Sequence, residues 1–183
     1  DEAYTYDDLG NRLTAAGTPG QWSYNANNEL LGYGSKTFTY DLNGNMTRKA
    51  DAGLQTTYIY DVEDRLMRVE RGSSSVIAEY HYDPFGRRLW KDVDGVRTYF
   101  VYSDEGLVGE YDASGVELRT YGWAPQSQWG TDPFFVKIGS QYYWYQNDHQ
   151  GTPQKIITGS GLVVWSATYD SFGNARVDVE VIT

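Results

Sequence analysis

Asp83-Pro84 followed by Gly86, in the stretch YHYDPFGRRLW at residues 80–90, could do chemistry. An Asp-Pro pair of this kind could belong to an acid-dependent cleavage site, or it could form a tight turn between two strands. Pro84 fixes its φ at about −65°, which suits the second position of a turn, and Gly86 tolerates a positive φ. We expect the turn, because the same pattern recurs along the chain.

His149 is a second candidate for chemistry. With Asp148 beside it, His149 could act as a general base, or it could bind a metal together with His81. Neighbours on a strand point to opposite faces, so Asp148 is poorly placed to orient His149, and we expect a structural histidine that caps a loop. The acidic residues lack the spacing of an EF-hand, and no carboxylate pair is singled out for glycoside hydrolysis. We therefore expect no catalytic residue, no metal site, no cofactor and no enzymatic activity.

Composition limits the classes of partner. The chain of 183 residues carries a formal net charge of −10, which argues against binding to nucleic acid or to an anionic membrane surface. It has no Cys, so it has neither a disulfide nor a cysteine nucleophile, and its apolar runs are too short to span a membrane. The acidic start of the chain does not resemble a signal peptide, and we expect a segment of a longer protein. The abundance of Tyr, with 17 copies, and of Gly, with 20, suits strands and turns.

The elements that would position these residues are hairpins. A tyrosine followed by a small acid, amide or hydroxyl residue recurs eight times, and the first six copies begin 16 to 22 residues apart. That spacing fits two strands and two turns per repeat. The repeat tyrosines are Tyr6, Tyr24, Tyr40, Tyr60, Tyr82, Tyr102, Tyr111 and Tyr169.

Each column of the repeat has a physical role. The second residue accepts a hydrogen bond from a backbone N–H two residues on, and the fifth is a Gly, Asn or Asp that tolerates positive φ, as in a type I turn followed by a bulge. The structural turn residues are therefore Asp7, Gly10, Asp41, Gly44, Asp61, Asp64, Asp83, Pro84, Gly86, Asp170 and Gly173.

Aromatic residues alternate before the turns. In six repeats a second aromatic stands two residues before the repeat tyrosine, so each pair shares one face of its strand. No segment keeps a helical apolar period. We predict an all-β fold, an antiparallel meander of about sixteen strands that must curl or spiral because a flat strip of that length exceeds a compact domain.

The repeats resemble the YD repeats of bacterial Rhs proteins, which are related to insecticidal toxin-complex shells and teneurins. NDHQGTP, residues 147–153, is similar to the Asp-His-Leu-Gly-Thr-Pro signature of the Rhs core, with Gln150 in place of Leu. The later stretch GSGLVVWSATYDSFGNARV matches the pattern that follows this signature. The signature residues are Asp148, His149, Gly151, Thr152, Pro153 and Trp165.

This resemblance implies a structural segment of a hollow shell that encloses a C-terminal polymorphic toxin. Such proteins are secreted or held at the cell surface, often use type VI secretion, and act in competition between bacteria. The implied partners are the rest of the shell and its toxin. In the family two close Asp-Pro-x-Gly elements release the toxin by autoproteolysis; no such doublet stands in this sequence, and we expect the cleavage motif outside the chain.

Three regions are expected: YD-repeat hairpins at residues 1–120, an irregular connecting loop at 121–140, and core-associated terminal strands at 141–183. The irregular region carries Trp123 and Trp129, which could contact a ligand. A surface binding module for carbohydrate or protein is therefore the alternative function. We expect instead that this loop packs on the sheet, and that unpaired edge strands favour self-association.

Overall fold

The alternating aromatic pattern folds entirely into strands. The computed structural model describes residues 3–18 and 20–182, and in that part it has eighteen strands and no helix. No segment among these residues forms a helix long and apolar enough to cross a membrane. The predicted all-β antiparallel meander is confirmed, with two strands more than expected.

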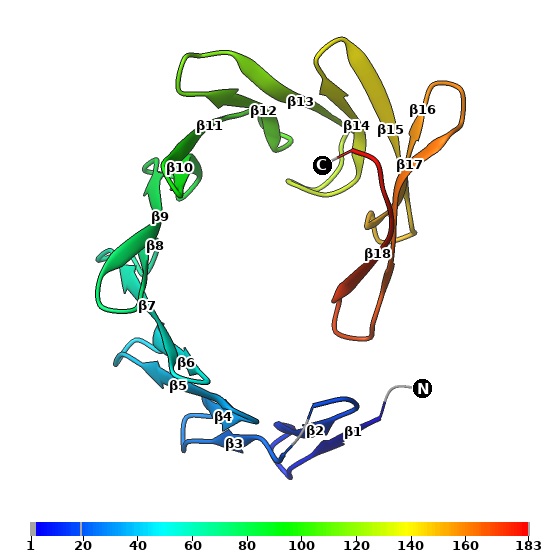
Figure 1. Cartoon of the computed structure of the whole chain (residues 1–183). Coiled ribbons are helices and arrows are strands. Elements are labelled where there is room, and N and C mark those ends of the chain that lie inside the picture. The colour runs from blue at the N-terminus through cyan, green and yellow to red at the C-terminus, as the bar shows by residue number, and fades with distance from the viewer. Residues whose placement is uncertain (1–2, 19, 183) are drawn as a thin grey trace. The chain divides into compact units, whose positions relative to one another are not determined.

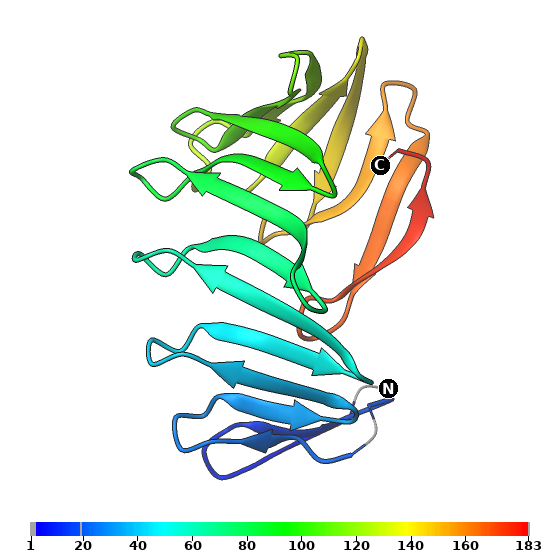
Figure 2. The same cartoon turned by 60° about the vertical axis from the view of Figure 1, so that its left-hand side comes forward.

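The chain divides into two units, Asp1–Val96 and Arg97–Thr183. In unit 1, β1 and β2 form a separate hairpin, and β3 to β10 follow one another in sequence order in an antiparallel sheet (Figures 1 and 2). The strands of unit 1 are β1 (Tyr4–Tyr6), β2 (Arg12–Ala15), β3 (Ser23–Tyr24), β4 (Leu30–Tyr33), β5 (Lys36–Tyr40), β6 (Met46–Asp51), β7 (Leu54–Tyr60), β8 (Leu66–Arg71), β9 (Ser75–Tyr82) and β10 (Arg88–Val93).

Unit 2 has the same sequential order of strands. Each of its strands pairs with the next one along the chain, and every pairing is antiparallel. Its strands are β11 (Val96–Tyr102), which starts at the boundary, β12 (Leu107–Asp112), β13 (Glu117–Trp123), β14 (Pro133–Ile138), β15 (Gln141–Asn147), β16 (Pro153–Thr158), β17 (Val163–Tyr169) and β18 (Ala175–Glu180).

The YD turns have the geometry that their residue types predict. In the turn after β5, Asp41 Oδ1 accepts hydrogen bonds from the N–H groups of Asn43 and Asn45, and the Gly44 N–H donates to the Asp41 carbonyl. Gly10, Gly44 and Gly86 have φ values of 84°, 86° and 79°, which are the positive values expected at this position. The strand register shifts between Thr39 and Tyr40, which places the bulge next to the repeat tyrosine.

The aromatic face is the better buried one. The first aromatics of the pairs, such as Trp22 and Phe38, are buried or half-buried, whereas Ile59 and Val101 on the opposite alternation are exposed. No large side chain among the described residues is completely buried. The sheet therefore has one drier face rather than a closed core.

The regions expected from the sequence differ from those observed. The segment 121–140 is not one irregular loop: β13 extends to Trp123, β14 starts at Pro133, and only residues 124–132 lie between them. Tyr121 pairs with Val136, so the two strands form a hairpin like the others. The cluster of aromatic residues on both sides of residues 124–132 suggested an irregular segment. These aromatics in fact continue the alternation of β13 and β14. The main division of the chain falls after Val96 rather than after residue 120.

Candidate functional site

Five of the repeat tyrosines tie their hairpin to the hairpin before it. Tyr60 in β7 donates its hydroxyl proton to the Met46 carbonyl at the start of β6, at 3.1 Å. The accepting residue stands two places after the left-handed turn residue of the preceding turn, and we call this contact a tyrosine latch. The same contact joins Tyr24 to Arg12, Tyr40 to Leu30, Tyr82 to Leu66 and Tyr169 to Pro153, at 2.7 to 2.9 Å.

Other residue types provide similar contacts in unit 2. The indole N–H of Trp123 donates to the Leu107 carbonyl at 2.8 Å, and the Asn147 side-chain amide donates to the Pro133 carbonyl at 2.9 Å. Trp123, which the sequence suggested as a ligand contact, therefore performs a structural role. Trp123 also packs against Gly106, where an added Cβ would lie 3.1 Å from its ring.

The signature NDHQGTP forms one more turn of the YD type, between β15 and β16. Asp148 Oδ1 accepts hydrogen bonds from the N–H groups of Gln150 and Thr152, and the Gly151 N–H donates to the Asp148 carbonyl. The Thr152 backbone bond, the first of several hydrogen bonds, lowers the pKa of Asp148. The exposed His149 stands at the second turn position. Asp148 and His149 thus lie in a turn, and the expected capping role of His149 stays a prediction.

The loop at residues 124–132 packs on two turns of unit 2. The Gly130 N–H donates to the Glu105 carbonyl at 2.9 Å, and the Trp129 ring stacks on Tyr102 with centroids 6.1 Å apart. At the other turn, a Cβ on Gly151 would lie 2.7 Å from Asp132 Oδ1. The loop therefore contacts the sheet, while Trp129 keeps about half of its surface exposed.

A cavity of about 200 Å³ lies on one face of the unit 2 sheet. After β18, the N–H groups of Val181 and Ile182 both donate to the Val164 carbonyl, and the chain turns back over this face (Figure 1). The cavity is lined by Arg119, Tyr121, Val136, Ile138, Tyr145, Ile156, Trp165, Glu180 and Ile182.

Beside the cavity lies a buried carboxylate. Glu110 in β12 is 8% exposed; it accepts a hydrogen bond from the Tyr121 hydroxyl at 2.6 Å and forms an ion pair with Arg119 at 3.4 Å. Burial, together with this hydrogen bond, raises the pKa of Tyr121, and burial also raises the pKa of Tyr145. Both hydroxyls therefore stay protonated at neutral pH and can only be neutral polar groups of the site.

The profile of the teneurin YD-shell family matches residues 1–180. The chain belongs to this family. The expected relation to Rhs and other YD-repeat proteins is confirmed.

The relatives of this YD-shell chain are much longer proteins, and the chain matches only a small part of each. It is 31% identical over 180 residues to the tRNA3(Ser)-specific nuclease WapA of Bacillus spizizenii, covering 93% of the chain and 7% of the relative. It is 26% identical to double-stranded DNA deaminase toxin A of Burkholderia cenocepacia, covering all of the chain and 14% of that protein. The pore of the Photorhabdus luminescens Tc holotoxin aligns with 96% of the chain and 13% of the solved chain, at 12% identity and a TM-score of 0.45.

The Glu110 carboxylate is engaged by Tyr121 and Arg119, and the cavity is smaller than most small-molecule sites, which run to about 300–1,000 Å³. Within the described residues, no group of three or more His, Cys, Asp or Glu side chains could hold a metal ion.

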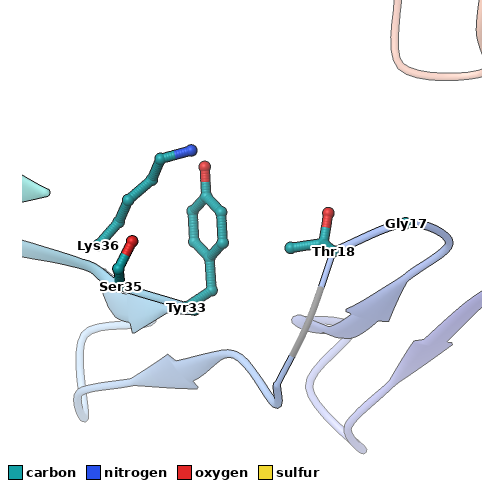
Figure 3. A pocket seen from close by; sticks show the side chains of 6 residues that line it. Gly17, Thr18, Tyr33, Ser35 and Lys36 are labelled. Atoms are coloured by element: carbon teal, nitrogen blue, oxygen red, sulfur yellow. The ribbon is translucent and has the colours of Figure 1, made fainter. Parts of the chain in front are cut away.

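Unit 1 of the YD-shell segment has a hollow of about 250 Å³ near Tyr33 and Lys36 (Figure 3). The Lys36 ammonium lies 5.0 Å from the Tyr33 ring centroid, and Tyr33 stacks on Trp22 at 4.4 Å. Ser35 donates a hydrogen bond to Asp51 at 2.6 Å. These side chains already have partners. The hollow is therefore the solvent-facing space beside the stacked rings of Trp22 and Tyr33.

Some functional residues had little signal in the sequence. Glu110 stands in an ordinary strand sequence, and its bond to Tyr121 depends on the register of β12 and β13. Thr158 opens a turn of YD geometry, with Oγ1 accepting from the Leu162 N–H and Gly161 at a φ of 86°. The turn glycine Gly161 was the only clue, because no tyrosine or Asp precedes it.

Proposed function

We propose that this chain is a structural segment of a YD shell that encloses a C-terminal toxin and helps to deliver it in competition between bacteria. Family membership supports the shell. Two relatives are named as a nuclease and a deaminase toxin, and these names support the proposal that the full-length protein carries a toxin. The full-length protein is exported and acts outside the cell or at its surface. This segment itself catalyses no reaction.

The tyrosine latches carry this proposal. Each one joins a hairpin to the preceding hairpin by a bond to the backbone, so it adds a side-chain link to the strand ladder. The turns are linked as well: Arg65 donates to the Asp83 carbonyl of the next YD turn at 3.1 Å. A sheet linked both within its strands and along its turns is suited to resist opening, which a container needs.

Limited proteolysis of the full-length protein, followed by intact-mass analysis, tests the enclosure. A closed shell protects a C-terminal polypeptide against added protease until the protein is denatured. Replacing two latch tyrosines, Tyr60→Phe with Tyr82→Phe, should shorten that protection, whereas Tyr58→Phe should not. A C-terminal region digested as fast in the native as in the denatured protein would contradict the proposal.

The alternative function is a surface module that binds carbohydrate or protein through aromatic side chains. The observation that favours it is the exposure of Trp129, Phe134 and Tyr142, each about half exposed in unit 2. Trp123 is half-buried, and its indole N–H already donates to the Leu107 carbonyl. A glycan array with the chain and its Trp129→Ala variant separates the two functions. Saturable binding that the substitution removes would favour the module, and no binding would favour the shell.

A further inference from the structure

The turn after β5 contains a pair of residues that is chemically labile. Asn43 is followed by Gly44, and it is the only asparagine of the chain that precedes a glycine. Both residues are exposed. The side-chain amide of an asparagine is open to attack by the backbone nitrogen of the next residue, and a glycine leaves that nitrogen accessible because it has no Cβ. Asn43 is therefore a candidate for spontaneous deamidation.

The reaction is a cyclisation followed by a hydrolysis. The Gly44 nitrogen loses its proton and forms a bond to Cγ of Asn43, while the bond from Cγ to Nδ2 breaks and the amide nitrogen leaves as ammonia. Water then opens either of the two C–N bonds of the ring, which is a cyclic imide. One opening gives an aspartate at position 43, and the other gives an isoaspartate with a longer backbone. Water is the only co-reactant, and no oxidant or reductant is needed.

The hydrogen bonds of the turn determine when this reaction can start. The Gly44 N–H donates to the Asp41 carbonyl at 3.2 Å, and the Asn43 N–H donates to Asp41 Oδ1 at 2.9 Å. The Gly44 nitrogen must release the Asp41 carbonyl before it attacks, so the reaction begins from a transient opening of the turn. Residues 41–44 are all exposed, and exposed turns are among the segments that open most readily.

The neighbouring turn gives the product a structural consequence. Asp64 Oδ1 accepts hydrogen bonds from the side-chain amides of Asn43 and Asn45, at 2.9 and 2.7 Å, and these bonds link the turn after β5 to the turn after β7. A carboxylate at position 43 has no N–H to donate to Asp64. It instead places a negative charge next to the Asp64 carboxylate, and like charges at this distance repel each other.

We propose that Asn43 deamidates spontaneously in the folded protein and that the product weakens the side-chain link between these two turns. One of the two hydrogen bonds to Asp64 is lost, and a repulsion takes its place. The backbone ladder between β6 and β7 is left intact, because the modified residue lies in a turn. This inference rests on unit 1 and does not depend on the proposed function.

The turn after β3 provides an internal control. Asn27 stands at the same place in that turn as Asn43 in its own, and it is also exposed. The Asn27 N–H donates to Asn25 Oδ1 at 3.0 Å, as the Asn43 N–H donates to the equivalent side chain. The next residue is Asn28, whose side chain crowds the backbone nitrogen. Asn27 should therefore keep its amide under conditions in which Asn43 loses it.

Peptide mapping of the complete chain by mass spectrometry, after prolonged incubation at neutral and mildly alkaline pH, tests the reaction. We expect the mass gain of an amide-to-acid conversion at Asn43, several-fold faster than at Asn27. The conversion should accelerate with pH, because the Gly44 nitrogen attacks after it loses its proton. Asn43→Gln should stay unconverted, since its longer side chain would have to close a larger ring.

Two outcomes of this measurement would overturn the proposal. In the first, Asn43 keeps its amide in the native chain but loses it in the urea-unfolded chain, which would show that the turn protects the residue. In the second, Asn43 and Asn27 convert at equal rates, which would remove the role of Gly44.

Thermal melting of Asn43→Asp tests the consequence. The substitution should lower Tm by about 1–3 °C in the parent chain, and added salt should reduce this loss because it screens the repulsion. In an Asp64→Asn background the loss should be smaller. Asn28 shows that asparagine suits this turn position, since its φ of 62° is close to the 60° of Asp64 and its Oδ1 accepts from Asn11. Equal losses in the two backgrounds would show that the product does not act through Asp64.

Discussion

Tyr121 donates its hydroxyl proton to Oε1 of Glu110, at 2.6 Å, across the hairpin of β12 and β13. Glu110 is a buried charge whose other carboxylate oxygen lies 3.4 Å from Arg119. Removing the donor leaves that carboxylate underbonded in a poorly solvated site. Tyr121→Phe should therefore lower the free energy of unfolding by about 1–3 kcal/mol. Urea denaturation measures the loss, and Tyr142→Phe, at a half-exposed position in β15, should lose little.

The tyrosine latch can be tested within one strand. Tyr60→Phe in β7 removes the hydroxyl that bonds to the Met46 carbonyl and should cost about 0.5–1.5 kcal/mol. Tyr58 lies two residues earlier on the same face, and its hydroxyl has no hydrogen-bond partner among the described residues, so Tyr58→Phe is the control. Thermal melting of both variants compares them. Equal losses from the two would show that the latch does not stabilise the sheet.

The positive φ of Gly86 gives a prediction about backbone strain alone. A Cβ at Gly86 would meet no atom within 4 Å, so we expect Gly86→Val to act mainly through the φ of 79°. The expected cost is about 1–3 kcal/mol. Gly159 also has open space but lacks a positive φ, and Gly159→Val should cost much less. Chemical denaturation decides, and a Gly86→Val variant as stable as the parent would refute the turn geometry.

Acid should loosen the turns. The Arg65 backbone N–H bond, with further bonds from Glu63 and the Arg65 guanidinium, lowers the pKa of Asp61. A pKa lowered by folding stabilises the native state above the unfolded value of about 3.9, and that stabilisation is lost as the pH falls through the folded pKa. Asp61→Asn keeps the acceptor, as Asn25 does in its own turn, but does not titrate. Melting between pH 6 and about 2.5 should therefore show a weaker pH dependence in the variant.

Much of the fold could be predicted from the sequence because each turn carries its own chemistry. Asp41 and Gly44 determine their turn locally, and Tyr40 marks the strand before it, so the meander follows from residues close together in the chain. The loop around Trp129 was predicted to be longer than it is. Tyr121 and Phe135 belong to the flanking strands, but the many aromatic residues of this segment hid the alternation that marks those strands.

The site was harder to predict because it depends on contacts between strands. The repeat tyrosine was recognised, yet its hydroxyl partner in the preceding hairpin depends on the register, which bulges such as that at Tyr40 change by one residue. Glu110 gave no signal, because a strand carboxylate is usually exposed. Gly151 was recognised as a signature residue, but its close contact with Asp132 joins segments about twenty positions apart.

Because a latch reaches only the neighbouring hairpin, the sheet is modular in length. Excising residues 41–60 would join Tyr40 directly to Asp61 and leave the Tyr-Asp junction intact. The Tyr40 bond to Leu30 and the Tyr82 bond to Leu66 would both survive, since neither involves the excised part. Duplication or loss of one such unit would thus change the length of the sheet by one hairpin without a new kind of contact.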